Sequence, residues 1–392
     1  MTPSARVQSA IEILDSIIGA ARHKGPPADR LIAQWFKDHR FAGSKDKAAI
    51  RELVYDAIRA CGPIPAEGRA AMLGLADERP DLKALFDGTP YGPGAIEEDE
   101  LVAPGGIAPE WLEDRLIASG ISEEEAQSLL SRAPLDTRIN RLKVAEGFGD
   151  LPEPGEPLPL PNALRFPAGT RVEEWEAYAQ GLIEVQDLGS QIACASVGAA
   201  PGDCVIDLCA GAGGKTLALA AAMANEGTLV AADTDKRRLS QLGPRAERAG
   251  AEIAHTLLLD PGREAEALAE WQGRADHVLV DAPCSGTGTW RRNPEARWRL
   301  TPAELGKLGT LQARLLELAA GLVKPGGHLT YVVCSLLDEE GAGQFARFLE
   351  EHPEWRAVPS AVPFGTPHGP GVRLTPSGHG TDGFFIARAA LA

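Results

Sequence analysis

The sequence lacks long hydrophobic runs, and its few cysteines are irregularly spaced. Across the 392 residues no apolar run reaches the roughly 18 residues that a membrane span requires. The first apolar stretch carries Arg6, Glu12 and Asp15, which is unlike a secretory signal peptide. The six cysteines show neither CxxC spacing nor a paired rhythm, which argues against a disulfide framework and a structural metal site. We therefore expect a cytoplasmic protein with no membrane partner and no metal.

The charge is acidic overall but unevenly distributed. The formal net charge is −16 at pH 7. Residues 76–130 hold fourteen acidic residues against three basic ones, whereas residues 1–60 hold ten Lys or Arg against seven acids. Because salt screens charges beyond about 8 Å, local patches count for more than the total. The acidic balance therefore does not exclude an RNA substrate.

The first third of the chain predicts helices. Apolar residues recur at helical spacing over 3–22 and 28–36, and Ser44 can cap a third helix. Further helices are predicted at about 66–75, 109–118 and 122–131. Two interpretations of the basic residues remain open, a solvated bundle surface or a surface that contacts RNA. These residues are Arg30, Lys37, Arg40, Lys45, Lys47 and Arg51.

The rest of the chain predicts an α/β architecture. Residues 131–184 contain short strand and helix signals, and residues 185–392 alternate strands with helices. Such alternation builds a doubly wound parallel sheet through right-handed crossovers. The predicted strands lie at 205–208, 228–232, 253–258, 277–280, 329–334 and 383–388, with long helices at 236–249 and 302–323.

A glycine-rich turn joins the first of these strands to a helix. Its sequence is Cys209-Ala210-Gly211-Ala212-Gly213-Gly214-Lys215-Thr216. A GxxxxGK[ST] phosphate loop would need glycine at Cys209, and a GxGxxG dinucleotide fingerprint would need glycine at Thr216. Asp233 follows at the end of the next strand, where an acid can accept both ribose hydroxyls. The turn therefore predicts an adenosine-type cofactor, S-adenosylmethionine included, without choosing one.

Two Cys-Ser pairs follow other strands of the predicted sheet. They occur in Asp281-Ala282-Pro283-Cys284-Ser285 and in Val333-Cys334-Ser335. Both lie at carboxyl ends of predicted parallel strands, which is the edge where open sheets bind ligands. A lone cysteine after a strand is usually a packing residue. Two Cys-Ser pairs on one edge, one preceded by Asp-x-Pro, instead indicate thiol chemistry.

With these motifs the sequence resembles the Nop/Sun family of RNA cytosine-C5 methyltransferases over nearly its whole length. Residues 291–298 resemble the bacterial 16S rRNA cytosine methyltransferase B branch, and residues 41–56 resemble its helical domain, which is similar to the antitermination factor NusB. The resemblance implies a NusB-like RNA-binding domain at 1–130, a small α/β linker region at 131–184 and a Rossmann-like catalytic domain at 185–392. Further matching residues are Val185, Gln186, Asp187, Asp260 and the ending Gly380 to Phe385.

The family chemistry explains why these residue types are needed. C5 of cytosine is a weak nucleophile, and a thiolate that adds at C6 makes C5 reactive toward a methylsulfonium. The resemblance implies that Cys334 is the nucleophile and that Cys284 releases the adduct. Sequence alone also allows the reverse, because DNA cytosine-C5 enzymes use a Pro-Cys nucleophile. The resemblance further implies that Asp281 holds the cytosine edge, that Lys215 contacts the base or the cofactor, and that Asp260 lies near the adenine.

The predicted S-adenosylmethionine site comprises Cys209, Ala210, Gly211, Ala212, Gly213, Gly214, Lys215, Asp233, Asp260 and Asp281. The chain departs from the family at Ala212, where proline is usual, and at Val333, where threonine is common. The first change alters loop stiffness only, because proline fixes φ without supplying a donor. The second removes a hydroxyl next to the predicted nucleophile.

The predicted partner is RNA, with 16S rRNA preferred over tRNA. Reaching C5 and C6 requires a cytosine that is single-stranded or flipped out of a helix. The basic and aromatic residues between 290 and 299 suit phosphate contact and base stacking, or else form a salt-bridged exposed loop with buried tryptophans. A monomer is expected. The competing classes are a non-catalytic RNA-binding ribosome-assembly factor and an adenosine-cofactor oxidoreductase.

Overall fold

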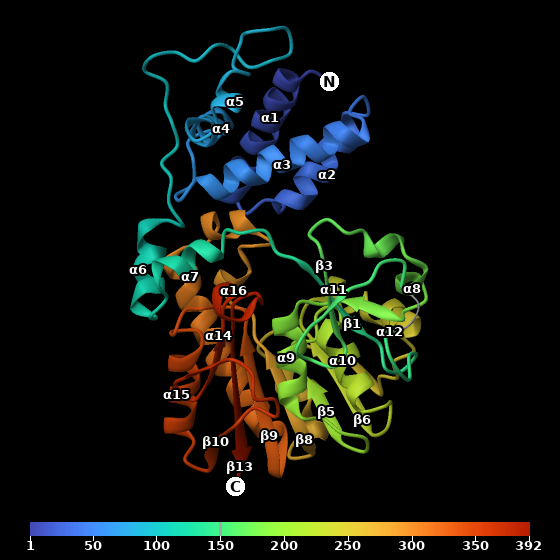
Figure 1. Cartoon of the computed structure of the whole chain (residues 1–392). Helices are drawn as coiled ribbons and strands as arrows, with labels where there is room; N and C mark the ends of the chain where they lie inside the picture. Colours follow the sequence, from blue (N-terminus) through green and yellow to red (C-terminus); the bar gives the residue numbers. More distant parts are fainter. Residues whose placement is uncertain (149–150) are drawn as a thin grey trace. The chain divides into compact units, whose positions relative to one another are not determined.

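The computed structural model describes residues 1–148 and 151–392, and these fall into two compact units. The helical unit contains Met1–Ser131 together with Thr289–Thr301. The α/β unit contains Arg132–Gly288 and Pro302–Ala392, and it holds both β-sheets (Figure 1). The three-part division that the sequence predicts stays a prediction. No helix among the described residues is long and apolar enough to span a bilayer.

The helical unit confirms the amphipathic pattern of the first third of the chain. Val7, Leu14, Ile17 and Ile18 of the first helix are buried in one apolar core together with residues of the next three helices. This burial of one helix stripe is what helical spacing of apolar residues produces. The helices are α1 (Pro3–Arg22), α2 (Ala28–Asp38), α3 (Ser44–Ala60), α4 (Gly68–Asp77), α5 (Pro80–Lys83), α6 (Glu110–Ala118) and α7 (Glu123–Ser128).

The predicted cap of the third helix is wrong by one residue. Helix α3 begins at Ser44, and its N-cap is Gly43. Asp46 supplies the capping group instead of Ser44, because its carboxylate accepts a hydrogen bond from Gly43 N at 3.2 Å. An acid in the first turn satisfies a free backbone N–H and also suits the positive end of the helix.

A small antiparallel sheet opens the α/β unit. Its strand order is β2-β3-β1-β4, where β1 is Leu135–Ile139, β2 is Glu156–Pro157, β3 is Ala163–Phe166 and β4 is Ile183–Val185. The 3-10 turn η1 (Val172–Glu174) and helix α8 (Glu176–Ala179) connect β3 to β4. The fully buried Asp136 of β1 pairs with Arg165 of β3 at 2.7 Å and also accepts from Leu188 N. These bonds tie the small sheet to the start of the next helix.

The large sheet confirms the predicted parallel strands and adds antiparallel ones. Five parallel strands run in the order β7-β6-β5-β8-β9, so the order reverses between β5 and β8. Ligands bind at such a reversal, outside the carboxyl ends of the strands. The strands are β5 (Cys204–Asp207), β6 (Thr228–Asp233), β7 (His255–Leu258), β8 (Ala275–Asp281) and β9 (Val323–Val333).

The last predicted strand is longer than expected and antiparallel to its neighbour. Strand β13 (Phe384–Leu391) pairs antiparallel with β9. The sequence analysis did not anticipate the three further antiparallel strands, β10 (Trp355–Val358), β11 (Thr366–His368) and β12 (Gly371–Leu374). A purely parallel sheet is therefore wrong for this edge, although the parallel half that carries the predicted site is as expected.

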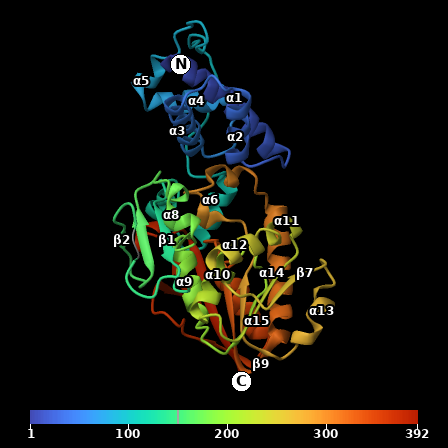
Figure 2. The same ribbon diagram turned by 90° about the vertical axis from the view of Figure 1, so that its right-hand side faces the viewer.

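Helices cover both faces of the large sheet, on opposite sides of it in Figures 1 and 2. Val205 packs in the cluster with α9 (Leu188–Val197) and α10 (Gly214–Ala222), whereas its neighbour Ile206 packs in the cluster with α14 (Pro302–Leu322) and α15 (Ala342–Glu351). This alternation is the period of two expected for a strand buried on both faces. The predicted helix 236–249 is split into α11 (Lys236–Leu239) and α12 (Leu242–Ala249); the remaining short helices are α13 (Glu264–Ala267) and α16 (Pro376–His379).

Candidate active site

The glycine-rich turn connects the end of β5 to the start of α10. Gly211 has φ +56° and Gly213 has φ +87°, which is the left-handed region that favours glycine. A Cβ at Gly213 would also collide with Leu242 of α12. A Cβ at Gly214 would meet nothing within 4 Å, so the first residue of α10 faces open space. The turn therefore leaves backbone N–H groups at a helix N-terminus accessible to a ligand.

Asp233 fastens this turn to the next strand. Its Oδ2 accepts from Gly211 N at 2.7 Å, and its Oδ1 accepts from Asp235 N at 2.6 Å. Each carboxylate oxygen can accept more than one hydrogen bond, so these bonds leave capacity for a ligand hydroxyl. The predicted contact of Asp233 with a ribose stays a prediction.

Asp207 lies at the end of β5 and is fully buried. Its Oδ2 accepts from Thr216 Oγ1 at 2.6 Å, which links the strand end to helix α10 across the turn. Its Oδ1 has no hydrogen-bond partner in the part of the chain that the structure describes. Burial raises the pKa of Asp207 to about 7, while the bond from Thr216 opposes the rise. Asp207 therefore orients the turn by tying the end of β5 to the start of α10.

Lys215 and Asp281 form an ion pair across the sheet edge. Lys215 Nζ lies 2.6 Å from Asp281 Oδ2, and it also lies over the ring of Phe384. Burial works against the charge of Lys215, but the neighbouring Asp281 carboxylate outweighs it and holds the pKa of Lys215 above its ordinary value. Lys215 is therefore a cation at neutral pH, fixed next to the end of β8.

The two cysteine motifs meet at the carboxyl edge of β8 and β9. Cys284 Sγ lies 3.4 Å from Cys334 Sγ, and both side chains are half-buried. The hydrogen bond with Cys334 raises the pKa of Cys284 well above its usual value, and burial adds to the rise. Cys284 is therefore a neutral thiol that can donate to Cys334. The expectation that the motifs share one edge is confirmed, whereas their separate roles stay predictions.

A close approach of two glycines joins the Cys284 loop to the last motif of the chain. Gly288 N donates to the carbonyl of Cys334 at 3.1 Å, and Gly383 N donates to the carbonyl of Gly288 at 2.8 Å. A Cβ at Gly288 would lie 2.7 Å from Gly383 Cα. Asp187 completes the junction by accepting from Asp382 N at 3.2 Å. The lead-in and ending motifs thus lie against the cysteine loops.

The structure gives each departure from the family pattern a local context. Val333 is fully buried and pairs with Phe385 in the ladder between β9 and β13. Its second methyl group packs in the apolar core where threonine would place a hydroxyl. The carbonyl of Ala212 accepts from Arg245 at 2.9 Å, so a side-chain bond helps to hold the turn in the absence of the family's proline.

The remaining predicted cofactor residues lie near the turn or beyond β7. Ala210 N donates to the carbonyl of Ala232 at 2.9 Å, and burial raises the pKa of Cys209 well above its usual value. Cys209 is therefore an unreactive thiol. Asp260 is exposed just after β7, and its carbonyl accepts from Arg263 N. Its predicted place beside an adenine stays a prediction.

The basic and aromatic segment at 289–301 belongs to the helical unit, not to the α/β unit. Arg297 is fully buried and donates to the carbonyls of Ile58 and Cys61, at 2.7 Å each. Trp298 is buried in the helical core, and its Nε1 donates to the carbonyl of Gly62. Trp290 is fully buried as well. The prediction that these tryptophans stack on RNA bases is therefore wrong, and their expected burial is confirmed. The expected exposed loop is wrong as well, because Arg291, Glu295 and Arg297 are also buried.

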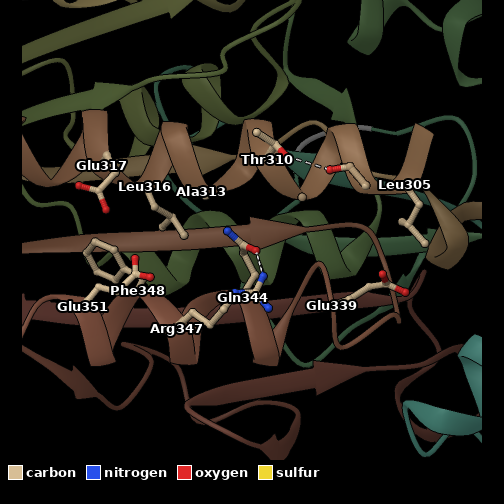
Figure 3. Close-up of a pocket in the computed structure, with 12 residues that line it drawn as sticks. Leu305, Thr310, Ala313, Leu316, Glu317, Glu339, Gln344, Arg347, Phe348 and Glu351 are labelled. Atoms are coloured by element: carbon tan, nitrogen blue, oxygen red, sulfur yellow. Dashed lines mark hydrogen bonds between the residues drawn. The ribbon is translucent and has the colours of Figure 1, made fainter. Parts of the chain in front are cut away.

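A groove of about 460 Å³ lies between α14 and α15, and it holds none of the predicted site residues (Figure 3). Leu305, Leu316 and Phe348 line it together with three glutamates. One of these is Glu339, which is labelled in Figure 3 at the end of the groove nearest the start of α15. The groove thus lies on the face of the sheet that α14 and α15 cover, and neither Cys284 nor Cys334 lines it.

Sequence reasoning missed two polar residues that contact the Cys284 loop. Glu340 and Gln312 are fully buried, and both hydrogen-bond within the Pro283–Ser285 segment. Glu340 ends the run Asp338-Glu339-Glu340, which is typical of a solvated surface, and Gln312 lies on a long helix. The one available signal was that Glu340 follows Cys334 closely in the chain. Ser285 was seen only as part of a motif.

The chain is similar to known RNA-modifying proteins. A family model described as 16S rRNA methyltransferase RsmB/F matches residues 196–390. Ribosomal RNA small subunit methyltransferase B of Enterobacter sp. (strain 638) is 32% identical over 334 residues, covering 79% of this chain and 74% of that protein. The probable ribosomal RNA small subunit methyltransferase B of Synechocystis sp. is 34% identical over 305 residues, covering 72% and 67% respectively.

Solved structures share the fold. A crystal structure of PH0851 is 25% identical with a TM-score of 0.78 and covers 99% of both chains. A methyltransferase homologue from Pyrococcus horikoshii is 26% identical with a TM-score of 0.59, covering 72% of this chain and 99% of that one. From the sequence relatives and the site geometry together, the chain belongs to the 16S rRNA methyltransferase RsmB/F family.

Proposed function

We propose that this protein methylates C5 of a cytosine in 16S rRNA through a covalent bond between Cys334 and C6 of the base. The observation that carries the proposal is the 3.4 Å approach of Cys284 and Cys334 at the carboxyl ends of two adjacent parallel strands. One thiol suffices to activate C5, and a second beside it suits the later release step. The relatives named as small subunit methyltransferases support rRNA over tRNA.

The glycine-rich turn fits S-adenosylmethionine. Gly214 and Lys215 open α10 at the end of the turn, where first-turn N–H groups can face a ligand, and Gly214 leaves room for the ligand to approach. In the proposal Asp233 takes the ribose, Asp260 lies near the adenine, and Asp281 lies between cofactor and base. When bound, the cofactor supplies the methyl group as an electrophile. The ion pair between Lys215 and Asp281 orients both side chains toward the same edge.

The two thiols take different roles because of their mutual hydrogen bond. The raised pKa of Cys284 keeps its proton on sulfur, so its S–H can donate to the Cys334 thiolate that attacks C6. Once Cys334 has formed a C–S bond it no longer carries a charge or accepts that hydrogen bond. When the C–S bond breaks after methyl transfer, Cys334 leaves as a thiolate and the S–H of Cys284 can again donate to it, while a separate base takes the C5 proton.

Covalent trapping tests this assignment. Cys284→Ala, incubated with S-adenosylmethionine and 16S rRNA, should accumulate a protein–RNA adduct that survives denaturing electrophoresis. The double variant Cys284→Ala/Cys334→Ala should form none, because it lacks the attacking thiol. Accumulation by Cys334→Ala alone would instead reverse the two roles.

The same assay separates the other candidate functions. Bisulfite mapping of cellular RNA with and without the gene would identify the modified cytosine and show whether it lies in rRNA or tRNA. Cofactor binding without methyl transfer to any RNA would point to a non-catalytic assembly factor. We further propose that the protein acts as a cytoplasmic monomer, with a cytosine that is single-stranded or flipped out of its helix.

A further inference from the structure

Glu340 is a fully buried carboxylate in the loop between β9 and α15. Its Oε1 accepts from Ser285 N at 2.8 Å and from Gln312 Nε2 at 3.0 Å, and its Oε2 accepts from Ser285 Oγ. Its backbone carbonyl accepts from the buried hydroxyl of Tyr331 at 2.7 Å. Its side-chain partners within the described residues are thus neutral donors. Burying a carboxyl group costs free energy, which suggests that Glu340 has a specific role at this position.

Glu340 and Gln312 hold the peptide on both sides of Cys284. The same Gln312 amide that donates to Glu340 also donates to the carbonyl of Pro283 at 2.9 Å. Glu340 itself binds Ser285, the residue after the cysteine. Pro283–Ser285 lies beyond the end of β8, so no strand ladder fixes this segment. The buried pair supplies the constraint that the sheet does not.

The serines of the two Cys-Ser pairs face each other and link the loops. Ser285 Oγ lies 3.2 Å from Ser335 Oγ, and Ser335 Oγ lies 3.0 Å from Thr287 Oγ1. Thr287 Oγ1 in turn accepts from Leu336 N at 2.9 Å. Each cysteine is therefore followed by a serine whose hydroxyl belongs to one connected network, and the carboxyl group of Glu340 is part of that network.

We propose that Glu340 is a positioning residue for adduct release, acting through Ser285 and Gln312 to hold Cys284 against Cys334. The inference rests on the proposed function. Loss of Glu340 should affect adduct release but not the attack on C6, because different contacts hold Cys284 and Cys334. Cys334 directly follows β9, which is paired on both sides by β8 and β13. Loss of Glu340 should therefore misplace Cys284 while leaving Cys334 in place to attack.

Glu340→Gln in the full-length protein is the primary test. Glutamine keeps the size of the side chain but has one acceptor oxygen where glutamate has two, so it cannot accept from Ser285 N, Gln312 Nε2 and Ser285 Oγ in the same arrangement. With S-adenosylmethionine and 16S rRNA this variant should still form the adduct and should accumulate it, as Cys284→Ala does. Turnover should fall by about a hundredfold, the scale of a lost acid–base contribution, with little change in KM for RNA.

Adduct accumulation distinguishes positioning from general stability. A purely structural role would lower the unfolding temperature and reduce attack and release together, so no adduct would build up. Glu339→Gln is the matched control, because this adjacent glutamate lines the groove between α14 and α15 (Figure 3). It should turn over normally without accumulating adduct.

Gln312→Met provides a second variant in case Glu340→Gln does not fold. It removes the donor to Pro283 and to Glu340 but keeps the bonds between Glu340 and Ser285. Its adduct should accumulate to a smaller extent than in Cys284→Ala. Normal turnover without adduct in a folded Gln312→Met or Glu340→Gln protein would overturn the inference. Failure of Cys284→Ala itself to trap RNA would instead contradict the proposed function.

Discussion

Asp207 combines two properties that bear on how the cofactor turn responds to pH. Its carboxyl group is fully buried, and one of its oxygens accepts from Thr216 at the start of α10. Burial raises its pKa to about 7, although the Thr216 bond favours the charged form. The group therefore gains or loses its proton near neutral pH.

Asp207→Asn should stabilise the protein increasingly as pH rises. The unfolded carboxyl titrates near pH 4 and the folded one near pH 7, so the folded protein binds the extra proton between these values. The stability that this proton contributes is present below about pH 4 and is lost as pH rises through 7. Asparagine has no such loss. The gain in unfolding free energy should be on the order of a few kcal/mol at pH 8 and small at pH 4.

Denaturant unfolding at several pH values measures this trend, and Asp235→Asn is a control of opposite sign. Hydrogen bonds from the backbone N–H groups of Arg238 and Arg237 lower the pKa of Asp235. Its contribution to stability is therefore present above the unfolded pKa and lost as pH falls through the folded one. A constant difference between Asp207→Asn and the parent protein across pH would contradict the assigned cause.

The predictable part of the site consists of residues at the ends of strands. Lys215, Asp281, Cys284 and Cys334 lie together because carboxyl ends of parallel strands share one edge. Glu340 was not predictable, since its sequence neighbours are acids and only the tertiary fold turns it inward. The prediction that Trp298 stacks on RNA was wrong for a related reason. Aromatic side chains among arginines are typical of either an interface or a core, and Trp298 lies in the core.

Among the structural elements, the junction between the Cys284 loop and β13 depends on two glycines. The backbones of Gly288 and Gly383 approach so closely that a Cβ on Gly288 has no space. Gly288 N donates to the carbonyl of Cys334, and the carbonyl of Gly288 accepts from Gly383 N. Helix α14 shows the opposite situation, because a Cβ at Gly309 would meet nothing within 4 Å. The two positions make a matched comparison.

Gly288→Ala should impair both stability and catalysis. The added methyl group must push the Gly383 backbone away, and overpacking of this kind costs about 1–3 kcal/mol. The loop should shift at Cys334 and Cys284, so methyl transfer should fall together with the unfolding temperature. Gly309→Ala should instead raise stability by up to about 1 kcal/mol, since alanine is the better helix former. Calorimetry and a methyl-transfer assay measure both; equal behaviour of the two variants would refute the steric argument.

At the level of elements, periodicity predicted the long helices and buried parallel strands but missed the short antiparallel ones. Strands β11 and β12 have three and four residues and contain proline or glycine, so no alternation could develop. The predicted helix 236–249 is interrupted between Leu239 and Leu242, just before Pro244. Proline is tolerated only in the first turn of a helix, which explains why a new helix begins there.

At the level of the whole molecule, the segment 289–301 interrupts the α/β unit in sequence but belongs to the helical unit. Arg297 anchors it by donating to the carbonyls of Ile58, Cys61 and Pro294. Burial lowers the pKa of Arg297 to about 10, so the side chain keeps its charge at neutral pH. Glu295 adds a second anchor, because it accepts from Ala28 N at the start of α2. The sequence alone did not reveal that this segment belongs to the helical unit.

Arg297→Met should destabilise the helical unit more than the α/β unit. Methionine fills a similar volume but cannot donate to the carbonyls that Arg297 binds. Ile58 O keeps the bond from Cys61 N, whereas Cys61 O loses the buried donor Arg297, and a buried acceptor left unpaired costs about 1–3 kcal/mol. Hydrogen exchange should therefore accelerate in α1 to α4 while the large sheet stays protected. Arg30→Met, a change at an exposed position of α2, is the control and should leave exchange unaltered. Uniform acceleration through both units would argue against a local anchor.

The chain crosses between the two units three times, after Ser131, Gly288 and Thr301. This limits how the protein can be dissected or recombined. A fragment that starts at residue 132 would expose Trp298 and Arg297 to water, and a fragment that ends at residue 131 would lack Trp298 from its core. A chimera that exchanges either unit with that of a relative therefore cannot be made with a single junction in the chain. The segment 289–301 must be exchanged together with residues 1–131, because it belongs to the same unit.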